Sequence, residues 1–138
     1  MLRIVFDTVV FVRSLINPYG KSGKIVFSHN KSYQLFVSEP IITEIIEVLH
    51  RPELTAKFQK LKDMDLSVIL ELLAQAPTVE ISKIPQASRD PKDNVFIATA
   101  LEAKADYLIT EDNDLLILNE YKGVKIINTD TFLHLLKQ

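Results

Sequence analysis

Residues 89–116, RDPKDNVFIATALEAKADYLITEDNDLL, combine a helix signal, a strand signal and an acidic turn, and the rest of the chain follows the same pattern. Asp90 is a favourable helix N-cap, a proline suited to the first helical position follows it, and Asp93 suits the first turn. The run DYLIT, residues 106–110, is too short for a helix and has the composition of a strand. Three acids follow it within four positions. Carboxylates crowded at a strand end repel one another, so water, backbone amides or a cation must offset their charge.

The remaining sequence alternates short apolar runs with stretches of helical period. Strands are expected at residues 3–6, 33–38, 78–82, 106–110 and 124–127, and helices at residues 39–52, 63–77 and 89–105. Strands that alternate with helices of this length favour a parallel sheet joined by right-handed crossovers. The expected fold class is therefore α/β.

Length and composition are typical of one folded domain, expected over residues 1–138. The chain is 47% apolar and 25% charged, as in ordinary globular proteins. The absence of cysteine excludes disulfides and thiolate metal sites and fits a cytoplasmic protein. The apolar runs are too short for a membrane span. A net charge of −2 means that any nucleic acid must be bound by a local basic patch or through metal ions.

Four acids are expected at the edge of the sheet where the parallel strands end. Asp7 directly follows the first strand, and Asp112 closely follows the strand in residues 106–110. Asp93 lies in the first turn of a helix that starts near this edge, and Glu44 lies beside the apolar stripe of another helix. Ligands bind at this edge in open parallel sheets. Because partly buried carboxylates are costly unless neutralised, the expected partner of these acids is a hard divalent cation, Mg²⁺ or Mn²⁺.

Each acid also has a purely local explanation. Asp7 can cap the helix that follows it, and Asp93 can interact favourably with a helix dipole. Glu44 can extend along its helix into water, and Asp112 with Asp114 can form an Asx-turn or a cap. The placement of all these acids at one edge nevertheless favours a shared site.

Four blocks of sequence carry a family resemblance: IVFDTVVFV, VSEPIITEIIEVL, the stretch at residues 89–116, and GVKIINTDTFLHLL. Their order and spacing resemble the PIN-domain nucleases, in particular the bacterial and archaeal toxin components of the VapC type, over essentially the whole chain. The resemblance implies a doubly wound, three-layer α/β/α sandwich with a mostly parallel five-stranded sheet. It also implies a Mg²⁺- or Mn²⁺-dependent ribonuclease.

The resemblance assigns roles to individual residues. The metal-binding and catalytic acids would be Asp7, Glu44, Asp93 and Asp112, with Thr110 as a hydroxyl that orients an acid or a water. Supporting residues around them would be Thr8, Asp90 and Asp114. Many relatives have Asn two positions after the first acid, whereas this chain has Val9, which cannot donate a side-chain hydrogen bond to the acids or to phosphate.

Metal-assisted hydrolysis would leave a 5′-phosphate and a 3′-hydroxyl and would need no cysteine or histidine nucleophile. We interpret His29, His50 and His134 as structural or surface residues. The residues expected to steer the RNA backbone are Arg13, Lys21, Lys24 and Lys92. Each of these cations can equally be an ordinary solubilising residue.

Two other classes of function are compatible with clustered acids. A phosphatase of the haloacid dehalogenase kind needs a second acid at the position of Val9, so it is disfavoured. A receiver-like module, or an inactive PIN-like scaffold that binds RNA or protein, remains an alternative.

As a toxin, the protein would have an antitoxin partner that inserts an arginine among the acids. This partner would anchor near Ile46 and Leu49, in a groove between residues 41–50 and 51–61. A homodimer is also expected from the resemblance.

Overall fold

A mixed five-stranded sheet forms the centre of the computed structural model, which describes residues 1–53 and 63–137. Its strands lie in the order β2-β1-β5-β7-β6. Their bounds are β1 Leu2–Phe6, β2 Tyr33–Leu35, β5 Tyr107–Ile109, β6 Glu120–Tyr121 and β7 Val124–Ile127. All neighbouring pairs are parallel except β6 with β7. A separate two-stranded parallel sheet pairs β3, Val37–Ser38, with β4, Thr78–Val79.

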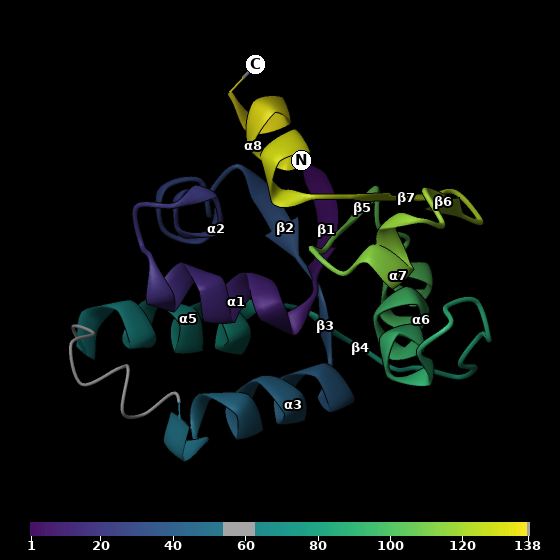
Figure 1. Cartoon of the computed structure of the whole chain (residues 1–138), viewed down its shortest axis with the longest axis horizontal. Helices are drawn as coiled ribbons and strands as arrows, with labels where there is room; N and C mark the ends of the chain where they lie inside the picture. The colour runs from purple at the N-terminus through teal and green to yellow at the C-terminus, as the bar shows by residue number, and fades with distance from the viewer. Residues whose placement is uncertain (54–62, 138) are drawn as a thin grey trace.

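Helices flank the central sheet and complete the expected three-layer α/β/α sandwich. Figure 1 shows α1 and α2 to the left of β1, and α6 and α7 below β7 and β6. The helical bounds are α1 Thr8–Ile16, α2 Lys21–Gly23, η1 Lys24–Ser28, α3 Glu39–Leu49, α5 Asp63–Gln75, η2 Pro91–Asp93, α6 Asn94–Glu102, α7 Asn113–Leu116 and α8 Thr129–Leu136. No helix in residues 1–53 and 63–137 is long and apolar enough to cross a membrane.

The strand expected at residues 33–38 was wrong as a single element. The Phe36 amide bonds the Ile4 carbonyl of β1, whereas the next amide, that of Val37, bonds the Pro77 carbonyl. The chain therefore changes sheets between these two residues. The apolar run at residues 35–37 cannot reveal such an exchange, because these residues are buried on both sides of it.

The composition of the central sheet also differs from expectation. The run at residues 78–82 forms only the short β4 and lies outside the five-stranded sheet. The fifth strand is β6, which the apolar pattern missed because it is a two-residue edge strand. It joins β7 through Lys122 and Gly123, whose φ angles of 48° and 93° suit a tight hairpin turn.

The helix expected at residues 89–105 begins as a 3₁₀ turn and continues as α6. Its predicted cap is confirmed, since the Asp90 carboxylate accepts the Lys92 amide at 3.0 Å. The helices expected at residues 39–52 and 63–77 end earlier, at Leu49 and Gln75. Each proline correctly indicated that a helix ends nearby. The first helix stops three residues before Pro52, and the second stops two residues before Pro77.

Buried aromatic rings hold the first strand against the helices on one face. Phe6 packs edge-to-face against Phe11 at 5.4 Å and Tyr33 at 5.4 Å, and Phe132 of α8 lies 6.4 Å away, all between ring centroids. Such pairs add about 0.5–1.5 kcal/mol each beyond their burial. Because Phe6 immediately precedes Asp7, this packing fixes the end of β1 where the acid begins.

Gly23 tests how closely the chain packs in this layer. An added Cβ would lie 2.1 Å from the Pro18 carbonyl oxygen. Helix propensity alone would favour Gly23→Ala by about 1 kcal/mol, but the collision should instead destabilise the fold by about 1–3 kcal/mol. Urea unfolding measures the change in stability, with Lys24→Ala, at the exposed residue that follows Gly23, as the control. A more stable Gly23→Ala protein would contradict this packing.

Candidate metal centre

The ends of β1 and β5 lie side by side at the point where the direction of strand order reverses. From β1 the chain continues to β2 on one side, whereas β5 lies on the other side. Phe6 and Ile109, the last residues of the two strands, are in register. Asp7 and Thr110 follow them directly, so the pairing brings the two side chains together. The crevice at such a reversal is where open α/β sheets bind ligands.

Asp7 is both a helix cap and a member of this crevice. Its carboxylate accepts the Thr110 hydroxyl at 2.8 Å and the Val9 amide at 3.3 Å, the latter as N-cap of α1. Burial raises the pKa of Asp7, and the charge of Asp112 adds to this effect, while the hydrogen bonds from Thr110 and Val9 oppose it. Asp7 therefore both caps α1 and lines the crevice.

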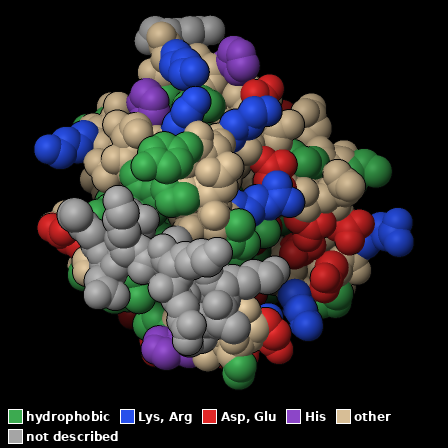
Figure 2. Space-filling model, turned by 60° about the vertical axis from the view of Figure 1, so that its left-hand side comes forward, with side chains coloured by type: hydrophobic (Ala, Val, Ile, Leu, Met, Phe, Trp, Pro, Cys, Tyr) green, Lys and Arg blue, Asp and Glu red, His purple; other side chains and the backbone are tan. Residues whose placement is uncertain are grey.

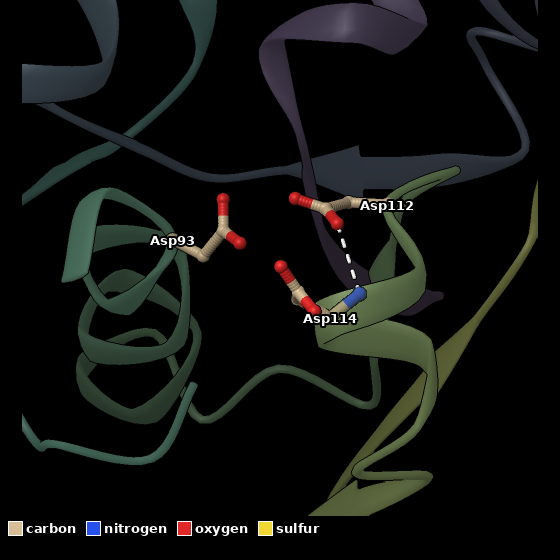
Figure 3. A group of neighbouring side chains, drawn as sticks. All are labelled: Asp93, Asp112 and Asp114. Atoms are coloured by element: carbon tan, nitrogen blue, oxygen red, sulfur yellow. Dashed lines mark hydrogen bonds between the residues drawn. The ribbon is translucent and has the colours of Figure 1, made fainter. Parts of the chain in front are cut away.

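Asp93, Asp112 and Asp114 offer carboxylate oxygens that all lie within 4.8 Å of one another. Figure 3 shows the three side chains directed toward one another from the start of α6 and the start of α7. Asp112 caps α7 by accepting the Asp114 amide at 2.9 Å, and its own amide donates to the Thr110 hydroxyl at 3.0 Å. Asp114 was expected only as a supporting residue, but the geometry places it in this close group.

The environment of Asp93 disfavours a negative charge. This residue is only 7% exposed. Burial, a hydrogen bond to the Asp112 carboxylate, and the negative charges of Asp112, Asp90 and Asp7 raise the pKa of Asp93 to about 7. A weak contact from the Ser88 hydroxyl, at 3.4 Å, does little to offset these effects. A cation would relieve the cost of ionising this carboxyl.

A depression of about 330 Å³ contains all four acids expected from the sequence. Its lining residues are Asp7, Val9, Arg13, Glu44, Asp90, Lys92, Asp93, Phe96, Glu111 and Asp112. Glu44 enters from α3, and its carboxylate accepts the Thr8 hydroxyl at 3.0 Å. Six carboxylates thus face two cationic side chains, and oxygen-rich, negatively charged sites of this kind suit Mg²⁺ or Mn²⁺.

Glu111 is a lining acid that the sequence did not rank as a site residue. Its carboxylate accepts the Thr129 amide at 2.9 Å and the Thr129 hydroxyl as well, which ties the loop after β5 to the start of α8. The sequence showed an acid beside Asp112 but carried no signal of this contact, because residues 111 and 129 come together only through the pairing of β5 with β7.

The four cations expected near the site are not equivalent. Arg13 and Lys92 line the acidic depression. Lys21 instead forms a 3.0 Å ion pair with Asp130, which holds the pKa of that carboxyl below its usual range. Lys24 is exposed on η1. Figure 2 shows acidic side chains gathered on one face with Lys and Arg side chains beside them.

A family model of the PIN domain matches residues 3–114, which include the four expected acids and their supporting residues. The chain belongs to the PIN-domain nuclease family. It is also similar to the uncharacterized protein MJ1680 of Methanocaldococcus jannaschii, with 34% identity over 136 residues that cover 92% of this chain and 82% of that protein. PIN-domain nucleases typically bind divalent metals, and the acidic group described above is compatible with that property.

The raised pKa of Asp93 predicts how pH affects the metal-free PIN-domain protein. Between the usual pKa of 3.8 and about 7, the folded state keeps a proton that the unfolded chain has lost. This contribution to stability is therefore present at low pH and lost as pH rises toward 7. Asp93→Asn should remove the loss and stabilise the protein at pH 7.5 by on the order of 1–3 kcal/mol.

Urea unfolding in the presence of a chelator, repeated from pH 4 to pH 8, measures the effect. The readout is the difference between the parent and Asp93→Asn, which should grow with pH. Glu120→Gln, at an exposed acid outside the depression, serves as control. A difference that stays constant with pH would contradict the expected titration.

Proposed function

We propose that this PIN-domain protein is a Mg²⁺- or Mn²⁺-dependent endoribonuclease. The observation that carries the proposal is the convergence of Asp7, Glu44, Asp93 and Asp112 in one depression at the reversal point of the sheet. Its products would be RNA ends with a 5′-phosphate and a 3′-hydroxyl. No described histidine lines the depression, and the chain has no cysteine, so the site offers no nucleophile of those types.

The donor set fits a hard divalent ion. Asp93, Asp112 and Asp114 supply closely spaced oxygens, and Asp7 and Glu44 line the acidic depression together with Asp93 and Asp112. Once bound, a divalent ion would supply a water of lowered pKa and would offset the charge of the phosphate that is attacked.

The protein's own hydroxyl groups would hold the acids in position. Thr110 donates to Asp7 and accepts from the Asp112 amide, so one side chain orients two of the acids. Thr8 donates a hydrogen bond to Glu44 and would hold that acid in position. These are positioning residues. Arg13 and Lys92, the cations among the lining residues, would attract the RNA backbone to an otherwise acidic site.

An inactive PIN-like scaffold is the principal alternative. A binding module would not require buried acids whose charges oppose one another, and replacing them would improve its stability. The raised pKa values of Asp7 and Asp93 therefore favour an acidic group that is retained for chemistry. Cleavage and metal binding, measured separately, distinguish the two functions.

Metal binding should stabilise the folded protein. For a dissociation constant ten to a hundred times below the metal concentration, binding adds about 1–3 kcal/mol. Thermal unfolding with and without millimolar Mn²⁺ should show this as a higher Tm for the parent and a much smaller change for Asp93→Asn. Equal shifts in both proteins would place the metal elsewhere.

RNA cleavage should depend on the acids more than folding does. Asp93→Asn and Asp112→Asn should each reduce Mn²⁺-dependent cleavage of single-stranded RNA by about 100-fold or more, because each removes a ligand charge. Glu47→Gln, at an exposed acid on the same helix as Glu44, should cleave like the parent.

Substitutions at Thr110 test the positioning role of its hydroxyl group in the same cleavage assay. Thr110→Ser keeps the hydroxyl and should retain most activity, whereas Thr110→Val should lower kcat without a matching change in KM. A fully active Asp93→Asn protein would refute its assignment as a catalytic acid. End mapping that found a 3′-phosphate would refute the proposed chemistry.

The VapC resemblance adds a biological role as toxin of a toxin–antitoxin pair. An antitoxin arginine would find several carboxylates in the depression, and Ile46, on the same helix as Glu44, is 42% exposed and could serve as an apolar anchor. The other wall of the expected groove falls in residues 54–62, which lie outside the described chain.

Expression of the parent, but not of Asp93→Asn, should arrest bacterial growth, and co-expression of a small neighbouring gene should restore it. Harmless expression of the parent would argue for a free-standing nuclease. Light scattering tests the expected homodimer.

A further inference from the structure

A second depression, of about 530 Å³, adjoins the acidic one. Arg13 and Glu111 line both, so the two share a wall. The residues that belong to the second depression alone come from the end of α1, the turn after it, α2 and the start of α8. Its volume lies in the range of small-molecule sites.

One face of α1 runs along both depressions. Val9 and Arg13 line the acidic one, and Arg13, Ile16 and Asn17 line the second. These positions are three or four residues apart and therefore share a helix face. At 1.5 Å per residue, the distance from Val9 to Asn17 is about 12 Å along the axis. A strand of RNA on this face would reach from the acids into the second depression.

The charges that line the second depression are already balanced. Lys21 is paired with Asp130 at 3.0 Å. Glu111 accepts two hydrogen bonds from Thr129. Arg13 remains as the cation at the wall between the depressions. The interior of the second depression is therefore suited to a polar, uncharged group rather than to a phosphate or a metal ion.

The uncharged lining offers hydrogen-bond donors beside an apolar surface. The side-chain oxygens of Asn17 and Asn128 accept the amides of Tyr19 and Thr131, and within the described chain their NH₂ groups have no partner. Ile16 lines the same depression and is 55% exposed. An apolar surface with amide donors complements a nucleobase, which has flat faces and acceptor atoms at its edge.

Tyr19 is an independent observation that points to the same ligand. Its side chain is 84% exposed, and it belongs to the turn in which Asn17 and Gly20 line the depression. Exposed aromatic rings beside a polar groove are the usual platforms on which single-stranded bases stack.

We propose that the second depression binds the base of the nucleotide next to the cleaved phosphate. Arg13, between the depressions, contacts the phosphate that links the two nucleotides, while Ile16 and Tyr19 contact the base. The inference rests on the proposed nuclease function and makes the substrate single-stranded RNA, because a paired base cannot turn into a lateral depression.

Binding of labelled octauridylate to the full chain tests the proposal, with an octamer of abasic ribose phosphates as the equally charged comparison. Ca²⁺ replaces Mn²⁺ so that the acids are neutralised, and gels confirm that the RNA stays intact. The parent should bind octauridylate about tenfold more tightly than the abasic octamer. Ile16→Ala and Tyr19→Ala should weaken binding of octauridylate about three- to tenfold and leave the abasic affinity unchanged.

Arg13→Ala should weaken binding of both octamers, because it removes a contact to phosphate. The controls are Ile117→Ala, at an isoleucine 78% exposed on another helix end, and Lys83→Ala for the loss of one charge at an exposed lysine outside both depressions, and both should stay within about twofold of the parent. Equal affinity of the parent for the two octamers, or an unchanged Ile16→Ala protein, overturns the base-binding proposal while leaving nuclease activity intact. Base-dependent binding without any Mn²⁺-dependent cleavage supports the depression and refutes the nuclease.

Discussion

The hydroxyl group of Thr110 joins the ends of two parallel strands, and the geometry of the acidic depression depends on it. It donates to Asp7 at the end of β1 and accepts the amide of Asp112 after β5. The bond exists because β1 and β5 are paired in a register that ends both strands at the same level. A shift of one residue would point Asp7 to the opposite face of the sheet, since side chains alternate along a strand. The register of β1 and β5 therefore brings Asp7 and Asp112 together.

Hydrogen bonds that look purely local make this concentration of charge tolerable. Asp7, Asp90 and Asp112 each cap a helix or turn by accepting a backbone amide, and the Val9 amide opposes the rise in the pKa of Asp7 that burial causes. Asp93 has no such cap and is the acid whose pKa rises most clearly. One carboxylate can thus cap a helix and also line the acidic depression. Asp93, which has no such cap, is the acid whose ionised form the neighbouring charges disfavour most clearly.

Much of this arrangement could be predicted from the sequence because its signals are local. The strand at DYLIT, the Asp90 cap and the position of Asp7 after an apolar run all follow from short-range patterns. Contacts between distant segments could not be predicted in the same way. The exchange of sheets at Phe36, the two-residue β6 and the contact of Glu111 with Thr129 depend on which segments become neighbours. The same limit explains why Asp114 was ranked below its neighbours, since its approach to Asp93 spans 21 residues of chain.

The exchange of sheets after Phe36 makes Glu44 structurally separable from the other acids. Glu44 lies on α3, which follows β3, and β3 pairs with β4 rather than with the central sheet. The Thr8 hydroxyl connects Glu44 with α1, and a contact between the Ser38 and Thr99 hydroxyls at 2.8 Å connects β3 with α6. Changes in β3 or β4 can therefore alter the position of Glu44 while the register of β1 and β5 keeps Asp7 and Thr110 in place. Such modularity lets a lineage adjust its preferred ion or substrate by small steps, without rebuilding the sheet that supports the site.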